Sequence, residues 1–147
     1  MEERFETFTV LINRISRSIK KLKNLEMAEY GLRGVHVSCI YYLYLTDNMT
    51  ATELCERCEE DKATISRSLD ELESGGYLIC VSKSAKRYNS PLVLTGRGRQ
   101  VGREIADKVN AVLDEVGVGM TEEERCVLYR GLTAICDSLE RCVQNMK

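Results

Sequence analysis

The sequence predicts a mainly α fold with a small β wing: a winged helix-turn-helix flanked by N- and C-terminal dimerisation helices. Residues 50–74 hold two short amphipathic segments, each preceded by a residue that caps helices well. Residues 77–94 hold two short apolar runs around a basic loop, as in a hairpin. Longer amphipathic stretches lie towards both ends of the chain. This order of elements is typical of a DNA-reading module held by flanking helices.

Residues 5–25 are expected to form the first helix, because apolar residues recur there at spacings of three and four. Residues 35–46 are apolar on nearly all sides, which predicts a helix in the centre of the core. The apolar stripe of the first helix comprises Phe5, Phe8, Ile12, Ile15, Ile19 and Leu22.

Capping patterns mark the two helices of the central region. In Thr50-x-x-Glu53 the hydroxyl and the carboxylate can each accept a hydrogen bond from the other residue's backbone amide, which predicts a short helix over 51–58. Asp61 is a good N-cap for the next helix. Gly75 and Gly76 are expected to end that helix.

Two short strands at 77–82 and 92–94 are expected around the loop 83–91. Thr95 can cap a helix over 96–116, and the second capping pattern, Thr121-x-x-Glu124, opens a last helix to about 144. The apolar side of this last helix comprises Val127, Leu128, Leu132, Ile135, Leu139 and Val143. Its stripe and that of the first helix favour pairing with a second copy of the chain.

The composition is that of one soluble globular domain. The chain has 147 residues, of which 44% are hydrophobic and 30% charged. The longest apolar run, 39–45, has seven residues, whereas a membrane-spanning helix needs about 20. The N-terminus also lacks the pattern of a signal peptide. We therefore expect a cytoplasmic protein that does not associate with membranes.

The charge distribution favours nucleic acid more than the net charge does. The net charge is −2, but no acidic residue occurs from Ser74 to Arg103. A phosphate backbone responds to such a local patch rather than to the total charge. The basic residues of this acid-free segment are Lys83, Lys86, Arg87, Arg97, Arg99 and Arg103.

The helix that begins after Asp61 carries the candidate base-reading side chains. A helix fits the major groove of B-DNA, and its first turns meet the base edges. Arg67 can make two hydrogen bonds to guanine, while Thr64 and Ser66 can reach a base or a phosphate. Lys62 and the helix N-terminus suit a phosphate. An ordinary solvent-exposed polar face is the competing interpretation.

The seven cysteines indicate neither a disulfide framework nor a metal site. Cys55 and Cys58 have the spacing of half a zinc site, but no second pair follows at a suitable distance and His36 is the only histidine. We therefore expect this pair to pack in the core, and we expect no metal and no cofactor. With one histidine and no nucleophile elbow, the chain is not expected to be an enzyme.

With these residues in view, the chain resembles the MarR family of transcriptional regulators. The segment 53–79 matches that family's Glu-Leu-Ala, Lys-x-Thr-Val-Ser/Thr-Arg, Leu-Glu and Gly-Leu-Ile pattern. Leu94-Thr95-x-x-Gly98 is similar to the family's Leu-Thr-x-x-Gly. The resemblance covers nearly the whole chain in the order of its elements.

The resemblance implies a homodimer that binds double-stranded DNA. Residues 1–147 would form one domain, with 1–30 and 100–147 as dimerisation helices and 31–99 as the winged module. Arg87 falls where the family's wing arginine enters the minor groove, but Lys86 stands where the family usually has an aspartate. The residues implied to bind DNA are Lys62, Ala63, Thr64, Ser66, Arg67, Lys83, Lys86 and Arg87.

The resemblance further implies a ligand-responsive repressor that binds a pseudo-palindromic operator. Its effector would be a small aromatic or phenolic molecule in a cleft between the dimerisation helices and the winged module. The residues expected to supply polar groups there are His36, Tyr41, Tyr42 and Tyr44, although ordinary core roles fit each of them equally well. Two alternatives remain: a regulator that senses oxidants through cysteines, and a winged-helix protein-interaction module without DNA activity.

Overall fold

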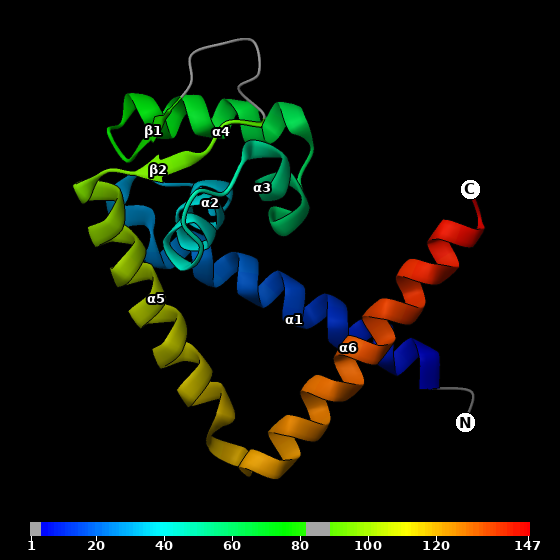
Figure 1. Ribbon diagram of the computed structural model, residues 1–147. Coiled ribbons are helices and arrows are strands. Elements are labelled where there is room, and N and C mark those ends of the chain that lie inside the picture. The colour runs from blue at the N-terminus through cyan, green and yellow to red at the C-terminus, as the bar shows by residue number, and fades with distance from the viewer. Residues whose placement is uncertain (1–3, 82–88) are drawn as a thin grey trace. The chain divides into compact units, whose positions relative to one another are not determined.

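The computed structural model describes residues 4–81 and 89–147 of the chain (Figure 1). The predicted wing residues Lys83, Lys86 and Arg87 lie outside this description. The chain divides into two compact units, Met1–Lys108 and Val109–Lys147. The first unit contains the helix-turn-helix and the sheet, and the second contains the last helix.

The expected mainly α fold with a small two-stranded sheet is confirmed (Figure 1). Each predicted helix is present within one or two residues of its predicted ends. The elements are α1 (Arg4–Glu26), η1 (Ala28–Tyr30), α2 (Gly34–Leu45), α3 (Ala51–Cys58), α4 (Lys62–Ser74), β1 (Leu78–Cys80), β2 (Leu92–Leu94), α5 (Gly96–Val116), η3 (Gly117–Gly119) and α6 (Glu122–Asn145).

The sheet is antiparallel, and Ile79 of β1 lies opposite Val93 of β2. The first strand is shorter than the predicted 77–82, for two local reasons. The Tyr77 amide is used by the end of α4, where it donates to Leu72 O at 2.9 Å. Beyond Cys80 the opposite residue is Pro91, which accepts a hydrogen bond from Val81 at 3.4 Å but has no amide to return one.

The predicted caps are confirmed. Thr50 Oγ1 accepts from the Glu53 amide at 3.2 Å, and Glu53 Oε2 accepts from the Thr50 amide at 2.7 Å. The same reciprocal pair joins Thr121 and Glu124 at 3.2 and 2.7 Å. Each pair satisfies two backbone donors that a helix start leaves unpaired. The sequence therefore sets the starts of α3 and α6 locally.

The core of the first unit forms around α2, which packs against α1, α3, α4 and β2. This confirms the central position predicted from its apolar surface. The side chains that are almost completely buried include Met27, Cys39, Ile40, Leu54, Ile65, Leu69, Leu72, Leu78, Leu92 and Ile105. Close packing of these side chains holds α4 and the sheet against the same core, so the polar side of α4 has a defined orientation.

Hydrogen bonds and a close backbone contact connect the end of α4, the sheet and the start of α5. Thr95 Oγ1 donates to Gly76 O at 2.6 Å and accepts from the Gly98 amide at 3.1 Å, so it caps α5 as expected. Gly98 lies directly against the backbone of Tyr77: a Cβ at this position would fall 1.9 Å from Tyr77 O. The glycine of the Leu-Thr-x-x-Gly segment is therefore required by close backbone contact.

Apolar side chains remain exposed on two helices, one in each unit. On α1, Ile15 is 54% exposed and Ile19 47%; on α6, Leu139 is 52% exposed, and no residue of that helix is buried. The exposed side chains include Ile12, Ile15, Ile19 and Leu22 of the first predicted stripe and Val127, Leu128, Ile135, Leu139 and Val143 of the second. Among the described residues, none of the helices is long and apolar enough to cross a membrane.

Candidate functional site

The five candidate residues of α4 divide between two sides of the helix. Lys62 and Ala63 are exposed, and Ser66 lies on their side of the helix and is half-buried. Thr64 is held by the N-cap, because its amide donates to Asp61 Oδ1 at 2.8 Å and its hydroxyl to Asp61 Oδ2 at 3.0 Å. Arg67 is exposed and lies between this outer side and a cavity. The N-terminal turns of α4 thus present a cation, small side chains and a guanidinium.

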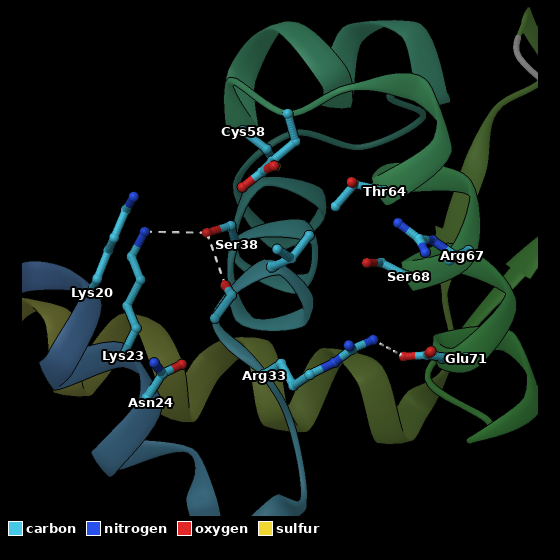
Figure 2. Close-up of a pocket in the computed structure, with 13 residues that line it drawn as sticks. Lys20, Lys23, Asn24, Arg33, Ser38, Cys58, Thr64, Arg67, Ser68 and Glu71 are labelled. Carbon is cyan, nitrogen blue, oxygen red and sulfur yellow. Dashed lines mark hydrogen bonds and ion pairs between the residues drawn. The ribbon is translucent and has the colours of Figure 1, made fainter.

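The cavity has a volume of about 470 Å³ and opens between α1, α2 and α4 (Figure 2). Ligand sites in proteins commonly occupy about 300–1,000 Å³, so this cavity is of a useful size. Its polar lining comes from four helices, the residue before α2 and the turn before α4. It comprises Lys20, Lys23, Asn24, Arg33, Ser38, Cys58, Glu60, Thr64, Arg67, Ser68 and Glu71.

Positive charge exceeds negative charge around the cavity. Four of its residues are basic and two are acidic. Lys23 Nζ donates to Ser38 Oγ at 3.1 Å and thereby links α1 to α2 (Figure 2). One of the two carboxylates, Glu71, is already paired with Arg33, whose guanidinium lies 2.5 Å from Glu71 Oε2. The cavity therefore suits an anionic group on a small molecule.

Glu71 is the centre of a small polar cluster that joins α2 to α4. Besides Arg33, its carboxylate contacts His36, with His36 Nε2 2.7 Å from Glu71 Oε2. The hydrogen bond from Arg33 and, to a lesser degree, that from His36 lower the pKa of Glu71 below its usual value of 4.5. His36 is buried and belongs to this structural cluster.

None of the four residues expected in an effector pocket lines this cavity. The rings of Tyr41 and Tyr42 pack on each other with their centroids 5.7 Å apart. Tyr44 lies against α5, where a Cβ on Gly102 would be 2.8 Å from its own Cβ. Their effector role remains a prediction.

The fold also gathers at the cavity four residues for which the sequence predicted no binding role: Lys20, Lys23, Arg33 and Ser38. The only local signal was the helical spacing of Lys20, Lys23 and Asn24, which places these side chains on one side of α1. Nothing in the sequence indicated that this side would meet the start of α2.

The cysteine pair was expected to be buried, and the structure corrects this: Cys55 and Cys58 are both only partly buried. Leu54, which immediately precedes Cys55, fills the core position of this helix and is completely buried. Cys39 of α2, by contrast, is completely buried. Within residues 4–81 and 89–147, no group of three or more His, Cys, Asp and Glu side chains is arranged to hold a metal ion.

The pKa values of Cys39 and Cys58 are shifted in opposite directions. Interaction with the Cys39 thiol lowers the pKa of Cys58, and nearby Lys23 lowers it further, while partial burial and Glu60 oppose the shift. Interaction with the Cys58 thiol and burial raise the pKa of Cys39. Burial raises the pKa of Cys55.

Two arginines of the acid-free segment have structural partners. The Arg97 guanidinium lies 4.4 Å from the centre of the Tyr77 ring and donates to Gly75 O at 2.9 Å. Arg99 pairs with Asp47 at 3.0 Å on the surface. The remaining basic residues before α5, at positions 83, 86 and 87, lie outside the described part of the chain.

Comparison with known proteins gives a consistent result. Residues 30–87 match the sequence model of the MarR family. No curated protein matches the chain by sequence. Among solved structures, a MarR family regulator from Neisseria meningitidis is similar at a TM-score of 0.82 and 18% identity, covering 98% of this chain and 99% of that one.

Two further structures extend the similarity. A transcriptional regulator of the MarR family from Silicibacter pomeroyi is 26% identical, with a TM-score of 0.75, and the match covers 85% of this chain and 84% of that one. MepR from S. aureus, in complex with DNA, is 19% identical with a TM-score of 0.76, and the match covers 90% of this chain and 96% of MepR.

Proposed function

We propose that this chain, a MarR family protein by the match of residues 30–87 and by its fold, is a sequence-specific DNA-binding transcriptional regulator. The observation that carries the proposal is the arrangement of α4. This helix follows α3 in a helix-turn-helix, is capped by Asp61, and presents Lys62 and Arg67 to solvent on its first turns. MepR, whose fold this chain shares, has been solved with DNA bound.

In this proposal, α4 enters the major groove with its N-terminal turns. Lys62 and the backbone amides at the helix start suit a phosphate, while Arg67 is long enough to reach the acceptors of a guanine. Lys83, Lys86 and Arg87 are proposed to contact the DNA backbone or minor groove from the wing. The function is binding rather than catalysis, and the proposed location is the cytoplasm, with the DNA.

We also propose that the working unit is a homodimer. The exposed apolar stripes of α1 and α6 are of the kind that pairs of helices bury against each other. Two copies of α4 would then read related half-sites about one helical turn of DNA apart, which makes a pseudo-palindromic operator the expected target.

The cavity between α1, α2 and α4 is the proposed effector site. Arg67 and Thr64, which belong to the helix that would read DNA, line this cavity. A ligand bound there would therefore compete with DNA for these two side chains. The cavity's excess of basic residues favours a small aromatic or phenolic anion. A ligand that prefers one arrangement of the dimer shifts the population towards or away from the DNA-binding form, which fits repression relieved by ligand.

The decisive experiment measures DNA binding across a series of salt concentrations. The full-length protein is incubated with DNA from upstream of its own gene, and affinity is read by fluorescence anisotropy. A specific complex that weakens steeply with salt is expected. Arg67→Ala should lower the binding free energy by about 1–3 kcal/mol and relax the sequence preference. Lys62→Ala should weaken binding to all DNA sequences alike and reduce the slope of log affinity against log salt concentration by about one.

Arg130→Ala is the matched control, because it removes the same charge from α6 and should leave affinity unchanged. The absence of any protein–DNA complex at low salt would reject the DNA-binding proposal and favour the protein-interaction module.

A second experiment tests the effector site. Benzoate, or neutral benzyl alcohol for comparison, is added to wild type and to Lys23→Ala, and thermal unfolding of each protein is followed.

A further inference from the structure

A buried hydroxyl group without a protein partner lies at the wall of the cavity. Ser68 of α4 lines the cavity and is only 2% exposed. Figure 2 shows its oxygen directed away from α4 toward the space between the helices. Within residues 4–81 and 89–147, this hydroxyl makes no hydrogen bond to the protein. Buried polar groups are nearly always hydrogen-bonded, so an unsatisfied hydroxyl that faces a cavity indicates a partner bound in that cavity.

Two of the four cations at the cavity are only partly used by the fold. The ammonium group of Lys23 donates to Ser38 Oγ at 3.1 Å and has further N–H donors. The guanidinium of Arg33 contacts Glu71 through Nη2, and its other N–H groups are not used in this contact. Both cations can therefore bind a ligand while they keep the contacts that link α1 to α2 and α2 to α4.

The other two cations approach the cavity from opposite sides. Lys20 comes from α1 and Arg67 from α4, next to Ser68 on the same helix (Figure 2). Donors thus face a ligand from several directions. A carboxylate offers two oxygens in one plane, whereas a phosphate group offers three strong acceptor oxygens arranged as a tetrahedron. The arrangement of donors therefore favours a tetrahedral anion.

The charge of the lining favours a dianion. Four basic and two acidic residues line the cavity, which leaves an excess of two positive charges. Glu71 is already paired with Arg33, so Glu60 is the carboxylate of the lining that opposes an anion most directly. A phosphomonoester carries a charge of about −1.5 to −2 at pH 7, whereas a carboxylate carries a single charge. Among the described residues of the lining, Val35 is the only aliphatic one, so recognition depends mainly on the anionic group.

We propose that the cavity binds a small molecule through a phosphomonoester group, held by the Ser68 hydroxyl between Lys20 of α1 and Arg67 of α4. Hydrogen bonds from charged donors to phosphate oxygens are among the strongest in proteins. The volume of about 470 Å³ leaves room for an organic body beyond the phosphate. The use of this site for regulation rests on the proposed function, but the binding of a phosphomonoester does not.

The test compares three ligands that share one aromatic ring, by isothermal titration calorimetry of the full-length protein in phosphate-free buffer without DNA. Phenyl phosphate carries a tetrahedral dianion, phenyl sulfate a tetrahedral monoanion and benzoate a flat monoanion. Phenyl phosphate should bind at least about tenfold more tightly than either of the others. An affinity for phenyl phosphate no higher than that for benzoate, or no binding of phenyl phosphate, would overturn the proposal.

Glycerol 3-phosphate identifies the body of the ligand. Binding as tight as that of phenyl phosphate would show that the phosphate suffices, with a polar body. Weaker binding that still exceeds that of benzoate would assign part of the affinity to an aromatic body. Both results support recognition through the phosphate.

The Lys20 and Lys21 side chains provide a matched pair of variants. Lys20→Ala should raise the Kd for phenyl phosphate at least about threefold, because an exposed cation contributes modestly to binding an anion. Lys21→Ala is the control, since Lys21 is exposed on the same helix but does not line the cavity. Equal Kd values for the two variants would contradict the proposed site.

Ser68→Ala separates ligand binding from folding. The Kd for phenyl phosphate should rise about tenfold, because a buried donor to the anion is lost. The free energy of unfolding should not fall, because this hydroxyl has no partner within the described part of the chain. A Ser68→Ala protein that is less stable but binds phenyl phosphate normally would show a structural role for the hydroxyl and overturn the proposal.

The two proposals can fail separately. If phenyl phosphate binds as expected to a protein that forms no complex with DNA, the proposed function fails and this inference stands. If the protein binds DNA specifically but shows no preference for phenyl phosphate over benzoate, this inference fails and the DNA-binding proposal stands.

Discussion

His36 Nε2 lies 2.7 Å from Glu71 Oε2, while His36 Nδ1 accepts a hydrogen bond from the Arg33 amide at 3.1 Å. Because Nδ1 is an acceptor, the neutral ring carries its proton on Nε2 and donates it to Glu71. The only histidine of the chain therefore links the N-terminus of α2 to α4. This contact orients α4, and the expected role of His36 in an effector pocket stays a prediction.

This relationship predicts how stability changes in acid. The Glu71 pKa is lowered below 4.5, mainly by Arg33, so the folded state holds this proton less tightly than the unfolded state does. The resulting stabilisation is present above about pH 4.5 and is lost as the pH falls through the lower folded-state value. Glu71→Gln should therefore be less stable than wild type at neutral pH, and the difference should shrink in acid.

Urea unfolding of both proteins from neutral pH to about pH 3 measures this difference. Glu56→Gln removes a carboxylate from the exposed side of α3 and serves as the matched control. An unchanged difference between wild type and Glu71→Gln across the whole pH range would show that the pair contributes nothing through its charge.

Gly98→Ala should destabilise the protein strongly. The added Cβ would lie 1.9 Å from Tyr77 O, a backbone atom that cannot move without disturbing the sheet. Overpacking of this kind costs about 1–3 kcal/mol, and the strain here should place the loss at or above the upper end. Chemical denaturation measures it. Gly96→Ala is the control, since nothing lies within 4 Å of its added Cβ; equal stability of the two variants would contradict the predicted contact.

The helices, their caps and the two strands followed from local rules, because spacing of apolar residues and capping groups act over three or four positions. Thr50, Asp61 and Thr121 cap as predicted. The cavity did not follow from such rules, because Lys23 and Arg33 line one cavity only after α1, α2 and α4 have taken their places in the fold.

The predicted burial of Cys55 and Cys58 was wrong for a related reason. Their positions in the sequence place Cys55 and Cys58 near Leu54 on α3. Successive side chains of a helix point in directions about 100° apart, so a side chain next to a core residue can lie at the edge of the buried face. Leu54 took the buried position and left both cysteines partly exposed. The thiol that lowers the pKa of Cys58 belongs to Cys39, nineteen positions earlier in the sequence on α2, which packs against α3.

Thr50→Ala should destabilise the protein by about 1 kcal/mol, because the Glu53 amide loses its acceptor at the start of α3. Thr50→Ser keeps the hydroxyl and should recover most of the loss. Thermal unfolding at matched concentration measures both. Equal losses for alanine and serine would indicate that the threonine methyl group, rather than the cap, carries the effect.

A charge placed within either exposed apolar stripe should weaken the proposed homodimer. Ile15→Glu on α1 and Leu139→Glu on α6 each introduce a carboxylate where the proposed interface must exclude water. We expect dimer dissociation constants to rise at least about tenfold, or about 1.4 kcal/mol, in sedimentation velocity. Ile79→Glu is the control, because Ile79 is also 54% exposed but belongs to β1 and to neither stripe. If the stripe variants associate as tightly as this control, the interface lies elsewhere.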